Sequence, residues 1–252
     1  MFATTGRTRR YSTSMEIGII GASGFLGTRL VDEALARGHR VRAFTRRGAG
    51  ERATRDTRAA IDRLVWRDLD IFDEAGVGAE ILTLDVLVSA YQPGNASIDM
   101  ADTLRRSIAD PSSYARAYRV LVRALERRIA TRLIVAGGAG SLERAPGDVI
   151  ADSPTLAEDL TALGLPAEYA VAVRGAREAL NLLRASNRRW TYVSPALDIR
   201  VGERTGRYRI GDDQLVVDAD GRSRISYEDL AVAIVDEIEW PRFIQRRFTI
   251  GY

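Results

Sequence analysis

The 252-residue chain contains no cysteine and no lysine, and His39 is its single histidine. Without cysteine, disulfides, thiol nucleophiles and thiolate metal sites are excluded. With one histidine, a multi-histidine metal centre is excluded as well, so we expect no metal site. We interpret His39, which follows Gly38, as a structural or solvated residue of a turn. Because all 37 basic residues are arginines, no side-chain ammonium group is available for catalysis.

Long hydrophobic runs are also missing, since none reaches the ~18 to 20 residues that a membrane-spanning helix needs. Residues 1–14 carry three arginines but no acidic residue, and they lack the apolar centre of a signal peptide. We interpret them as a disordered basic tail and expect a cytoplasmic protein without a membrane partner. The whole chain has 37 basic and 34 acidic residues, so the part after this tail is neutral. We therefore expect no nucleic-acid partner.

The apolar pattern predicts an alternation of strands and helices over residues 15–252. With 46% hydrophobic residues, the chain can bury one large core. Short apolar runs predict strands at 17–20, 40–44, 64–66, 85–90, 132–136, 190–194 and 246–250. Helical spacing predicts helices at 26–35, 114–128, 168–185 and 230–238, and residues 48–60 form a loop or a short exposed helix. This alternation predicts an α/β fold with a parallel sheet covered on both faces.

Three regularly spaced glycines lie between the first predicted strand and the first predicted helix. Gly21 would allow a tight turn, Gly24 would let the backbone approach a pyrophosphate, and Gly27 would let the helix pack closely on the sheet. Free N–H groups and the helix dipole favour an anion there. We therefore predict a dinucleotide site, with an ordinary glycine-containing turn as the alternative.

Polar residues at later strand ends suggest which dinucleotide would bind. Arg46 follows the second strand, where NAD-binding proteins usually carry an acid and an arginine suits a 2′-phosphate instead. NADP is therefore favoured and NAD stays open, unless Arg46 and Arg47 are merely solvated. Asp70, after the third strand, could accept a hydrogen bond from adenine or could only cap the next turn.

Small and polar residues follow the fourth and fifth predicted strands, at 91–95 and 137–141. At the carboxyl ends of parallel strands they fit the edge of a flat ligand. Residues 142–166 are rich in turn residues and acids, which predicts a loop over a site. Residues 200–221 are rich in glycine and charge, and we interpret both segments as lying on the substrate side.

Four stretches together resemble one family of proteins: 19–27 (IIGASGFLG), 137–143 (GGAGSLE), 202–208 (GERTGRY) and 223–229 (SRISYED). They resemble atypical short-chain dehydrogenase/reductases, namely the small NAD(P)H-binding proteins grouped with NADH-flavin reductases and NmrA-like proteins. The resemblance implies a single-domain Rossmann fold with a doubly wound, mostly parallel sheet. It also implies cofactor contacts for Gly21, Ser23, Gly24, Phe25, Leu26, Gly27, Arg46, Asp70, Ser89, Ala90, Gly137 and Pro195.

The chain departs from this family at its catalytic pair. Many short-chain dehydrogenases use Tyr-x-x-x-Lys, in which the ammonium group lowers the pKa of the tyrosine. Here Tyr169 opens the corresponding helix, but Val173 stands at the lysine position. Arg174 could supply a nearby positive charge, but its guanidinium has a different geometry and always stays protonated. A simple alcohol dehydrogenase or ketoreductase is therefore disfavoured.

These observations predict an NADPH-dependent reductase that passes hydride to a flat conjugated acceptor, such as a flavin or a quinone. Such an acceptor delocalises the incoming charge, so orientation and proximity can carry the reaction. Ser141 and Tyr169 are the candidate catalytic residues. The alternative is that Ser141 only caps a turn and Tyr169 only packs. Two other functions stay open, a non-catalytic NADP(H)-sensing regulator of NmrA-like type and an epimerase or ketoreductase that uses Tyr169 with Arg174. The expected partner is a small-molecule substrate, and a homo-oligomer stays open.

Overall fold

The computed structural model of the protein describes residues 14–55 and 62–252. The predicted disordered tail therefore lies outside the described residues except at position 14, as does the end of the predicted 48–60 loop. The described part of that loop contains a short helix, α2, over Ala49–Arg55. The exposed-helix alternative is thus the one that the structure supports for these residues.

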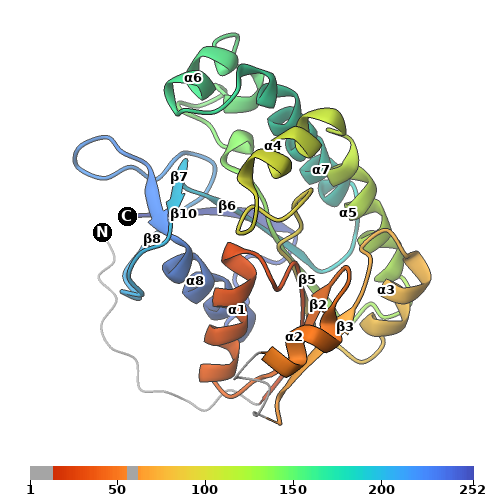
Figure 1. Cartoon of the computed structure of the whole chain (residues 1–252). Coiled ribbons are helices and arrows are strands. Elements are labelled where there is room, and N and C mark those ends of the chain that lie inside the picture. The colour runs from red at the N-terminus through yellow and green to blue at the C-terminus, as the bar shows by residue number, and fades with distance from the viewer. Residues whose placement is uncertain (1–13, 56–61) are drawn as a thin grey trace.

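The centre of the fold is an eight-stranded sheet in the order β3-β2-β1-β4-β5-β6-β10-β8 (Figure 1). Its strands are β1 (Glu16–Ile20), β2 (Arg40–Thr45), β3 (Leu64–Asp68), β4 (Val86–Ser89), β5 (Arg132–Ala136), β6 (Trp190–Pro195), β8 (Arg209–Gly211) and β10 (Arg246–Gly251). Every neighbouring pair is parallel except β10 and β8. The predicted doubly wound, mostly parallel sheet is confirmed.

The strand order reverses direction between β1 and β4. The chain adds β2 and β3 on one side of β1, then crosses over to place β4, β5 and β6 on the other. In open parallel sheets such a switch point leaves a crevice at the carboxyl ends of the strands, where ligands bind. Ile20 and Ser89 are in register across this switch point.

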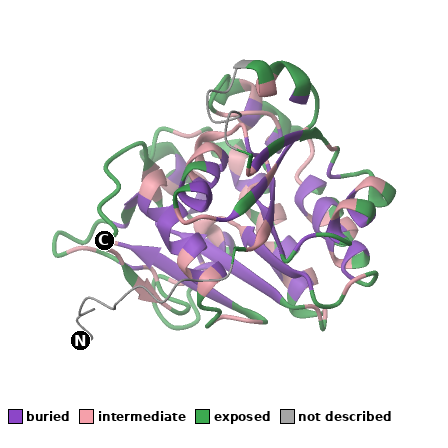
Figure 2. Ribbon diagram, turned by 90° about the horizontal axis from the view of Figure 1, so that it is seen from below, coloured by how far each residue is buried: buried purple, intermediate pink, exposed green. Residues whose placement is uncertain are grey.

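Helices cover both faces of the sheet. One face is packed by α1 (Phe25–Ala36), α2 and α8 (Tyr227–Glu239), whose apolar residues join those of β1, β2 and β10 in one core. The other is packed by α3 (Glu74–Ile81), α5 (Ser113–Ala124) and α7 (Ala170–Arg184) in a second core. Figure 2 shows buried strands running between these helical layers. Hydrophobic burial on both faces accounts for the continuous apolar runs of the inner strands.

A third, smaller core accounts for one wrong prediction. Residues 142–166 were predicted to be a loop, but they contain a 3-10 turn at Ile150–Asp152 and α6 (Leu156–Ala162). Leu142, Leu156 and Leu160 are buried together with Ala170 at the start of α7. This apolar cluster holds the segment against α7, at the top of Figure 1.

Short elements also escaped the sequence pattern. Helix α3 and helix α4 (Met100–Ala109) are capped by Asp73 and Asp99, which accept from backbone N–H groups three residues later. The pair β7 (Asp198–Arg200) and β9 (Arg224–Ser226) forms a two-stranded parallel sheet. Three-residue strands are too short for a readable alternation. Helix α8 is capped by Ser226, whose side chain accepts from Asp229 N at 3.0 Å.

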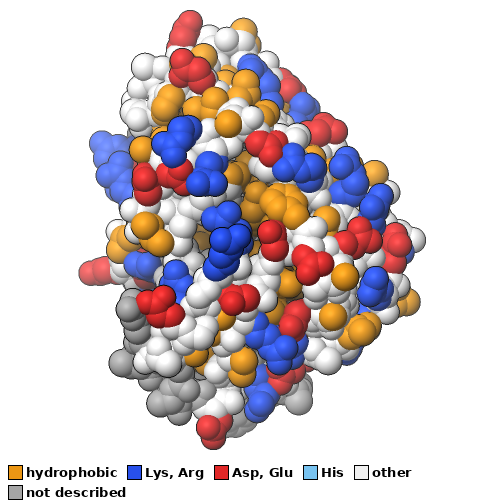
Figure 3. All heavy atoms as spheres, turned by 45° about the vertical axis from the view of Figure 1, so that its right-hand side comes forward, with side chains coloured by type: hydrophobic (Ala, Val, Ile, Leu, Met, Phe, Trp, Pro, Cys, Tyr) orange, Lys and Arg blue, Asp and Glu red, His pale blue; other side chains and the backbone are white. Residues whose placement is uncertain are grey.

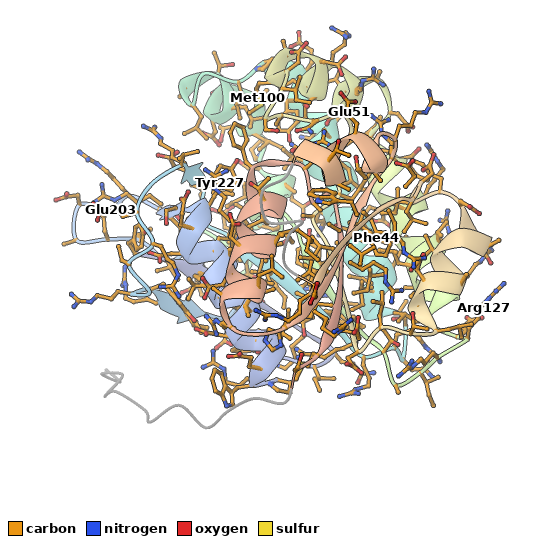
Figure 4. All side chains as sticks on the ribbon, turned by 60° about the horizontal axis from the view of Figure 1, so that its bottom comes forward. Phe44, Glu51, Met100, Arg127, Glu203 and Tyr227 are labelled. Atoms are coloured by element: carbon orange, nitrogen blue, oxygen red, sulfur yellow. The ribbon has the colours of Figure 1, made fainter. Side chains whose placement is uncertain are left out.

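Residues 202–208 lie along the outer side of α1 and α8. The Arg204 guanidinium pairs with Glu33 of α1 at 2.6 Å. The buried carboxylate of Asp229 accepts from Thr205 Oγ1 at 2.5 Å, Gly206 N at 2.7 Å and Tyr252 Oη at 2.8 Å. This part of the predicted substrate-side segment therefore connects α1 to α8. Figure 4 shows Glu203 on the outside of the molecule here.

His39 is a structural residue. Its side chain is 1% exposed, its Nδ1 atom accepts from Met15 N at 3.3 Å, and its Nε2 atom lies 3.1 Å from Glu239 Oε1. The solvated alternative is thus wrong, because the turn folds under the end of α8. Among the described residues, no helix is long and apolar enough to cross a bilayer.

Candidate functional site

The predicted cofactor residues gather along one edge of the sheet. Parallel strands in the order β3-β2-β1-β4-β5-β6 bring their carboxyl ends to the same edge. The predicted residues that follow or close these strands are Asp70, Arg46, Gly21, Ala90, Gly137 and Pro195, in that order. They form a continuous line across the switch point, and a dinucleotide that binds there can contact several strand ends at once.

The glycine turn after β1 leaves room for a phosphate. Gly21 has φ 77°, and a Cβ atom there would lie 2.6 Å from the Ala90 carbonyl oxygen. A Cβ atom on Gly27 would overlap the Gly21 carbonyl, so both glycines are required by close packing. A Cβ atom on Gly24 would meet only the Gly21 oxygen, at 3.4 Å. The space over Gly24 is therefore open, and the turn fits a pyrophosphate.

The start of α1 presents backbone N–H groups at this turn. Gly24 is its N-cap and supplies no side chain to bond them, whereas neighbouring α8 is capped by Ser226. Phe25 stacks on Tyr227 with a centroid distance of 5.3 Å, and Leu26 packs against the core. Their side chains are thus directed into packing while their N–H groups and the helix dipole remain for an anion. Figure 4 shows Tyr227 beside the starts of both helices.

Arg46 is exposed after β2 and, within residues 14–55 and 62–252, has no hydrogen-bond or ion-pair partner. It lies close enough to Tyr91, after β4, for its positive charge to lower the pKa of that hydroxyl against the larger effect of burial, which raises it. A guanidinium between two strand ends is suited to a phosphate monoester. On the face of the molecule that Figure 3 draws, arginines and acidic side chains are interspersed around hydrophobic side chains.

The structure also shows the surroundings of three further predicted cofactor residues. Asp70 is exposed, and its Oδ1 atom accepts from Phe72 N at 3.0 Å, so it closes a turn. Among the described residues its second carboxylate oxygen has no hydrogen-bond partner. Ser89 is fully buried, and among the described residues its Oγ atom has no partner. A Cβ atom on Gly137 would overlap the Tyr192 ring, so the packing of Tyr192 already requires this glycine.

Tyr169 is half-buried at the start of α7, and among the described residues no cation shifts its pKa. Burial raises the pKa of its hydroxyl, and nearby Tyr227 raises it further, while Tyr114 opposes the shift. Val173 packs on Gly140, where a Cβ atom would overlap its Cγ1 atom. Arg174 donates to the Ala151 carbonyl at 3.2 Å. Tyr169 therefore stays protonated at neutral pH and can donate a hydrogen bond, but it is not prepared to act as a base.

Ser141 belongs to a buried polar network. Its side chain lies 2.9 Å from Ser194 Oγ, and its carbonyl accepts from Arg247, which also pairs with Asp213. Ser141 is 7% exposed. Sequence reasoning missed Ser194 and Arg247, because β10 is buried at every position after Arg246 and its burial does not alternate along the strand. Of the two candidate catalytic residues, Ser141 belongs to this network, whereas the hydroxyl of Tyr169 is influenced by Tyr114 and Tyr227.

The switch-point edge, the open glycine turn and the uncapped start of α1 define a dinucleotide-binding protein of the Rossmann class. A model of the NAD(P)H-binding family matches residues 21–241. The chain belongs to this NAD(P)H-binding family, which confirms the resemblance drawn from the sequence.

Relatives of known sequence or structure extend over nearly the whole chain. YwnB of Bacillus subtilis (strain 168) is 34% identical over 242 residues, which cover 94% of this chain and 98% of YwnB. The crystal structure of a "putative epimerase" from Bacteroides thetaiotaomicron is 33% identical, with a TM-score of 0.75 over 95% of this chain and 98% of that one. That of a "putative NADH-flavin reductase" from Streptococcus pneumoniae TIGR4 is 26% identical, with a TM-score of 0.74 over 94% and 99%.

Proposed function

We propose that the protein is an NADPH-dependent reductase that passes hydride to a flat conjugated acceptor of the flavin or quinone type. The observation that carries this proposal is the environment of Tyr169, a protonated hydroxyl with a raised pKa and an apolar Val173 at the position of the usual lysine. An acceptor that delocalises negative charge needs no strong acid or base from the protein. The likeness to the Streptococcus pneumoniae protein supports the same class of acceptor.

Each part of the edge has a role toward the cofactor, which supplies the hydride when bound. The N–H groups at the start of α1 bind the pyrophosphate, and Arg46 binds the 2′-phosphate that distinguishes NADP from NAD. The second oxygen of Asp70 accepts from the adenine amino group. Ala90 and Gly137 let the cofactor lie close to the backbone at the ends of β4 and β5, with Pro195 closing β6.

Aromatic side chains would hold the acceptor. The stacked pair of Phe25 and Tyr227 lies at the glycine turn, and Tyr169 is close enough for the Tyr227 hydroxyl to affect its pKa. Aromatic rings pack well against planar ligands. Tyr169 donates a hydrogen bond to the acceptor atom that gains charge, and Ser141 supports the loop after β5 from inside. We place this activity in the cytoplasm, with a small-molecule substrate and no nucleic-acid partner.

A second function rests on the same two hydroxyls. Ser141 belongs to a buried network, and in the described part of the chain no cation activates Tyr169. The protein therefore also suits an NADP(H)-sensing role without chemistry. The epimerase alternative has less support within the chain, because Arg174 donates to the Ala151 carbonyl.

The test mixes the protein and NADPH with a panel of flavins and quinones and follows the nicotinamide absorbance band. Consumption of NADPH by one acceptor supports the reductase, and it should fall in the Gly24→Ala variant, whose methyl group fills the phosphate seat. Binding of NADPH without consumption across the panel would favour the sensor. No binding of either dinucleotide would overturn both functions.

A further inference from the structure

The loop between β4 and α4 is hydrogen-bonded to the glycine turn through Ser23. The Asn95 Nδ2 atom lies 3.3 Å from Ser23 Oγ and 3.5 Å from the Ser23 carbonyl oxygen. The Ser97 hydroxyl lies 3.2 Å from the same carbonyl. Gly94, with φ 86°, turns the chain so that Asn95 returns to the glycine turn. Two segments 72 residues apart are thus joined at the predicted phosphate seat.

The orientation of the Asn95 amide is fixed by its other contacts. Its Oδ1 atom accepts from Ser97 N at 3.1 Å and from Ser97 Oγ at 2.6 Å. A backbone N–H group can only donate, so the atom that faces Ser97 must be the oxygen. The atom that faces Ser23 is therefore the amide nitrogen, which can only donate. In this contact the Ser23 hydroxyl must act as the acceptor.

This contact excludes one direction for the Ser23 proton. The hydroxyl has one proton, and its side facing Asn95 is occupied by an incoming hydrogen bond. Within the described part of the chain, no acceptor for that proton lies within hydrogen-bond distance. Ser23 is half-buried and directly precedes Gly24, over which the turn is open. The proton is therefore free for an anion at the start of α1.

We propose that Asn95 is a positioning residue for dinucleotide binding. It holds the Ser23 hydroxyl as a donor toward the pyrophosphate, and it acts through Ser23 without touching the ligand. This inference rests on the proposed binding of NADPH at the glycine turn. It adds a residue from the β4–α4 loop, outside the glycine motif, to the phosphate seat.

A double-mutant cycle on the dissociation constant of NADPH tests the coupling, with fluorescence titration as the readout. Losing a hydrogen bond to a charged group costs about tenfold in affinity, so Ser23→Ala should bind NADPH about tenfold more weakly. Asn95→Ala should weaken it by about threefold to tenfold, because the hydroxyl proton is then no longer directed. The double variant should bind like Ser23→Ala alone. Additive losses would overturn the proposal.

A variant that introduces a carboxylate beside Ser23 tests the direction of the proton. In Asn95→Asp the new carboxylate accepts the Ser23 proton, so NADPH should bind more weakly than to Asn95→Ala. The carboxylate also repels phosphate, and this repulsion remains when Ser23 is alanine. The difference between Asn95→Asp and Asn95→Ala should therefore shrink in the Ser23→Ala background. An unchanged difference would mean that charge repulsion explains the loss, and the proposal would be wrong.

Adenosine 2′-phosphate separates this role from general damage to the loop. It carries adenine and the 2′-phosphate but no pyrophosphate, so Asn95→Ala should bind it as the wild type does. Asn181→Ala, an asparagine on α7 bonded to Glu178, is the matched control and should leave NADPH binding unchanged. Equal weakening of both ligands by Asn95→Ala would overturn the proposal. A wild-type protein that binds neither dinucleotide would overturn the proposed function with it, whereas equal NADPH binding by wild type and Asn95→Ala overturns this inference alone.

Discussion

Val173 and Gly140 are packed so closely that a Cβ atom on Gly140 would overlap the Val173 Cγ1 atom. The residue at the position of the usual lysine thus holds the loop after β5 against α7. A long charged side chain at this position would meet the backbone of that loop. The apolar residue therefore has a packing role of its own, in addition to bringing no positive charge to the usual lysine position.

This contact predicts that alanine substitution destabilises one of two nearby glycines and not the other. Gly140→Ala should lower the free energy of unfolding by about 1 to 3 kcal/mol, because overpacking strains a filled site. Gly138→Ala should be nearly neutral, since a Cβ atom there has no neighbour within 4 Å. Urea denaturation measures both, and adding Val173→Ala to Gly140→Ala should restore part of the loss. Equal effects at the two glycines would show that the overlap is relieved in another way.

Arg46 should set the preference for the phosphorylated cofactor. Arg46→Ala should weaken NADPH binding about tenfold and leave NADH binding almost unchanged, because only NADPH carries the 2′-phosphate. Arg47→Ala is the matched control, since Arg47 is equally exposed and adjacent in sequence. Titration of all three proteins with both dinucleotides gives the comparison. Parallel losses for NADPH and NADH in Arg46→Ala would remove the assigned role.

His39 should make the protein less stable in mild acid. Burial lowers the pKa of His39 below its usual 6.5, although Glu239 opposes the shift. The folded protein therefore favours the neutral ring, while the unfolded chain takes up a proton as the pH falls through about 6.5. The free energy of unfolding should be unaffected above that pH and should decrease below it. Urea midpoints at several pH values should show a shallower decrease in His39→Gln, and identical slopes would contradict this origin.

Tyr169 should give no basic limb to the pH profile of the reductase. Because burial places the pKa of its hydroxyl above the usual value, the group stays protonated from about pH 7 to about pH 9. Initial rates of NADPH consumption should be flat over this range. Tyr169→Phe should lower kcat/KM by about tenfold, the worth of one hydrogen bond. An ionisation within this range that disappears in Tyr169→Phe would show that the tyrosine titrates during turnover.

The most informative features of the sequence were the continuous apolar runs and the spaced glycines. Inner strands such as Arg132–Ala136 are buried on both faces, so continuous apolar runs identify them. The glycine turn could be predicted because Gly21 and Gly27 are required by the backbone itself. Helix α6 could not be predicted, because Leu156 and Leu160 are buried only through packing with Leu142 in the folded chain. Their burial depends on residues distant in the sequence.

The site shows the same division. Arg46 and Asp70 could be placed because they directly follow strands. The burial of Ser141 depends on Arg247, which is 106 residues away, and no local pattern connects the two. Asn95 was recognised only as part of a polar strand end, because its contact with Ser23 is formed by the crossover between β1 and β4. Contacts that depend on topology become visible only in the folded chain.

The buried Asp229 carboxylate joins α8 to Thr205, Gly206 and Tyr252. If any of these donors leaves, a buried charge is left with too few hydrogen bonds, and the remaining ones lose their support. We therefore expect the contacts to the Asp229 carboxylate to break in a single cooperative step. Amide exchange at Gly206 would then report the fraying of Tyr252, although the two residues lie in segments 46 positions apart.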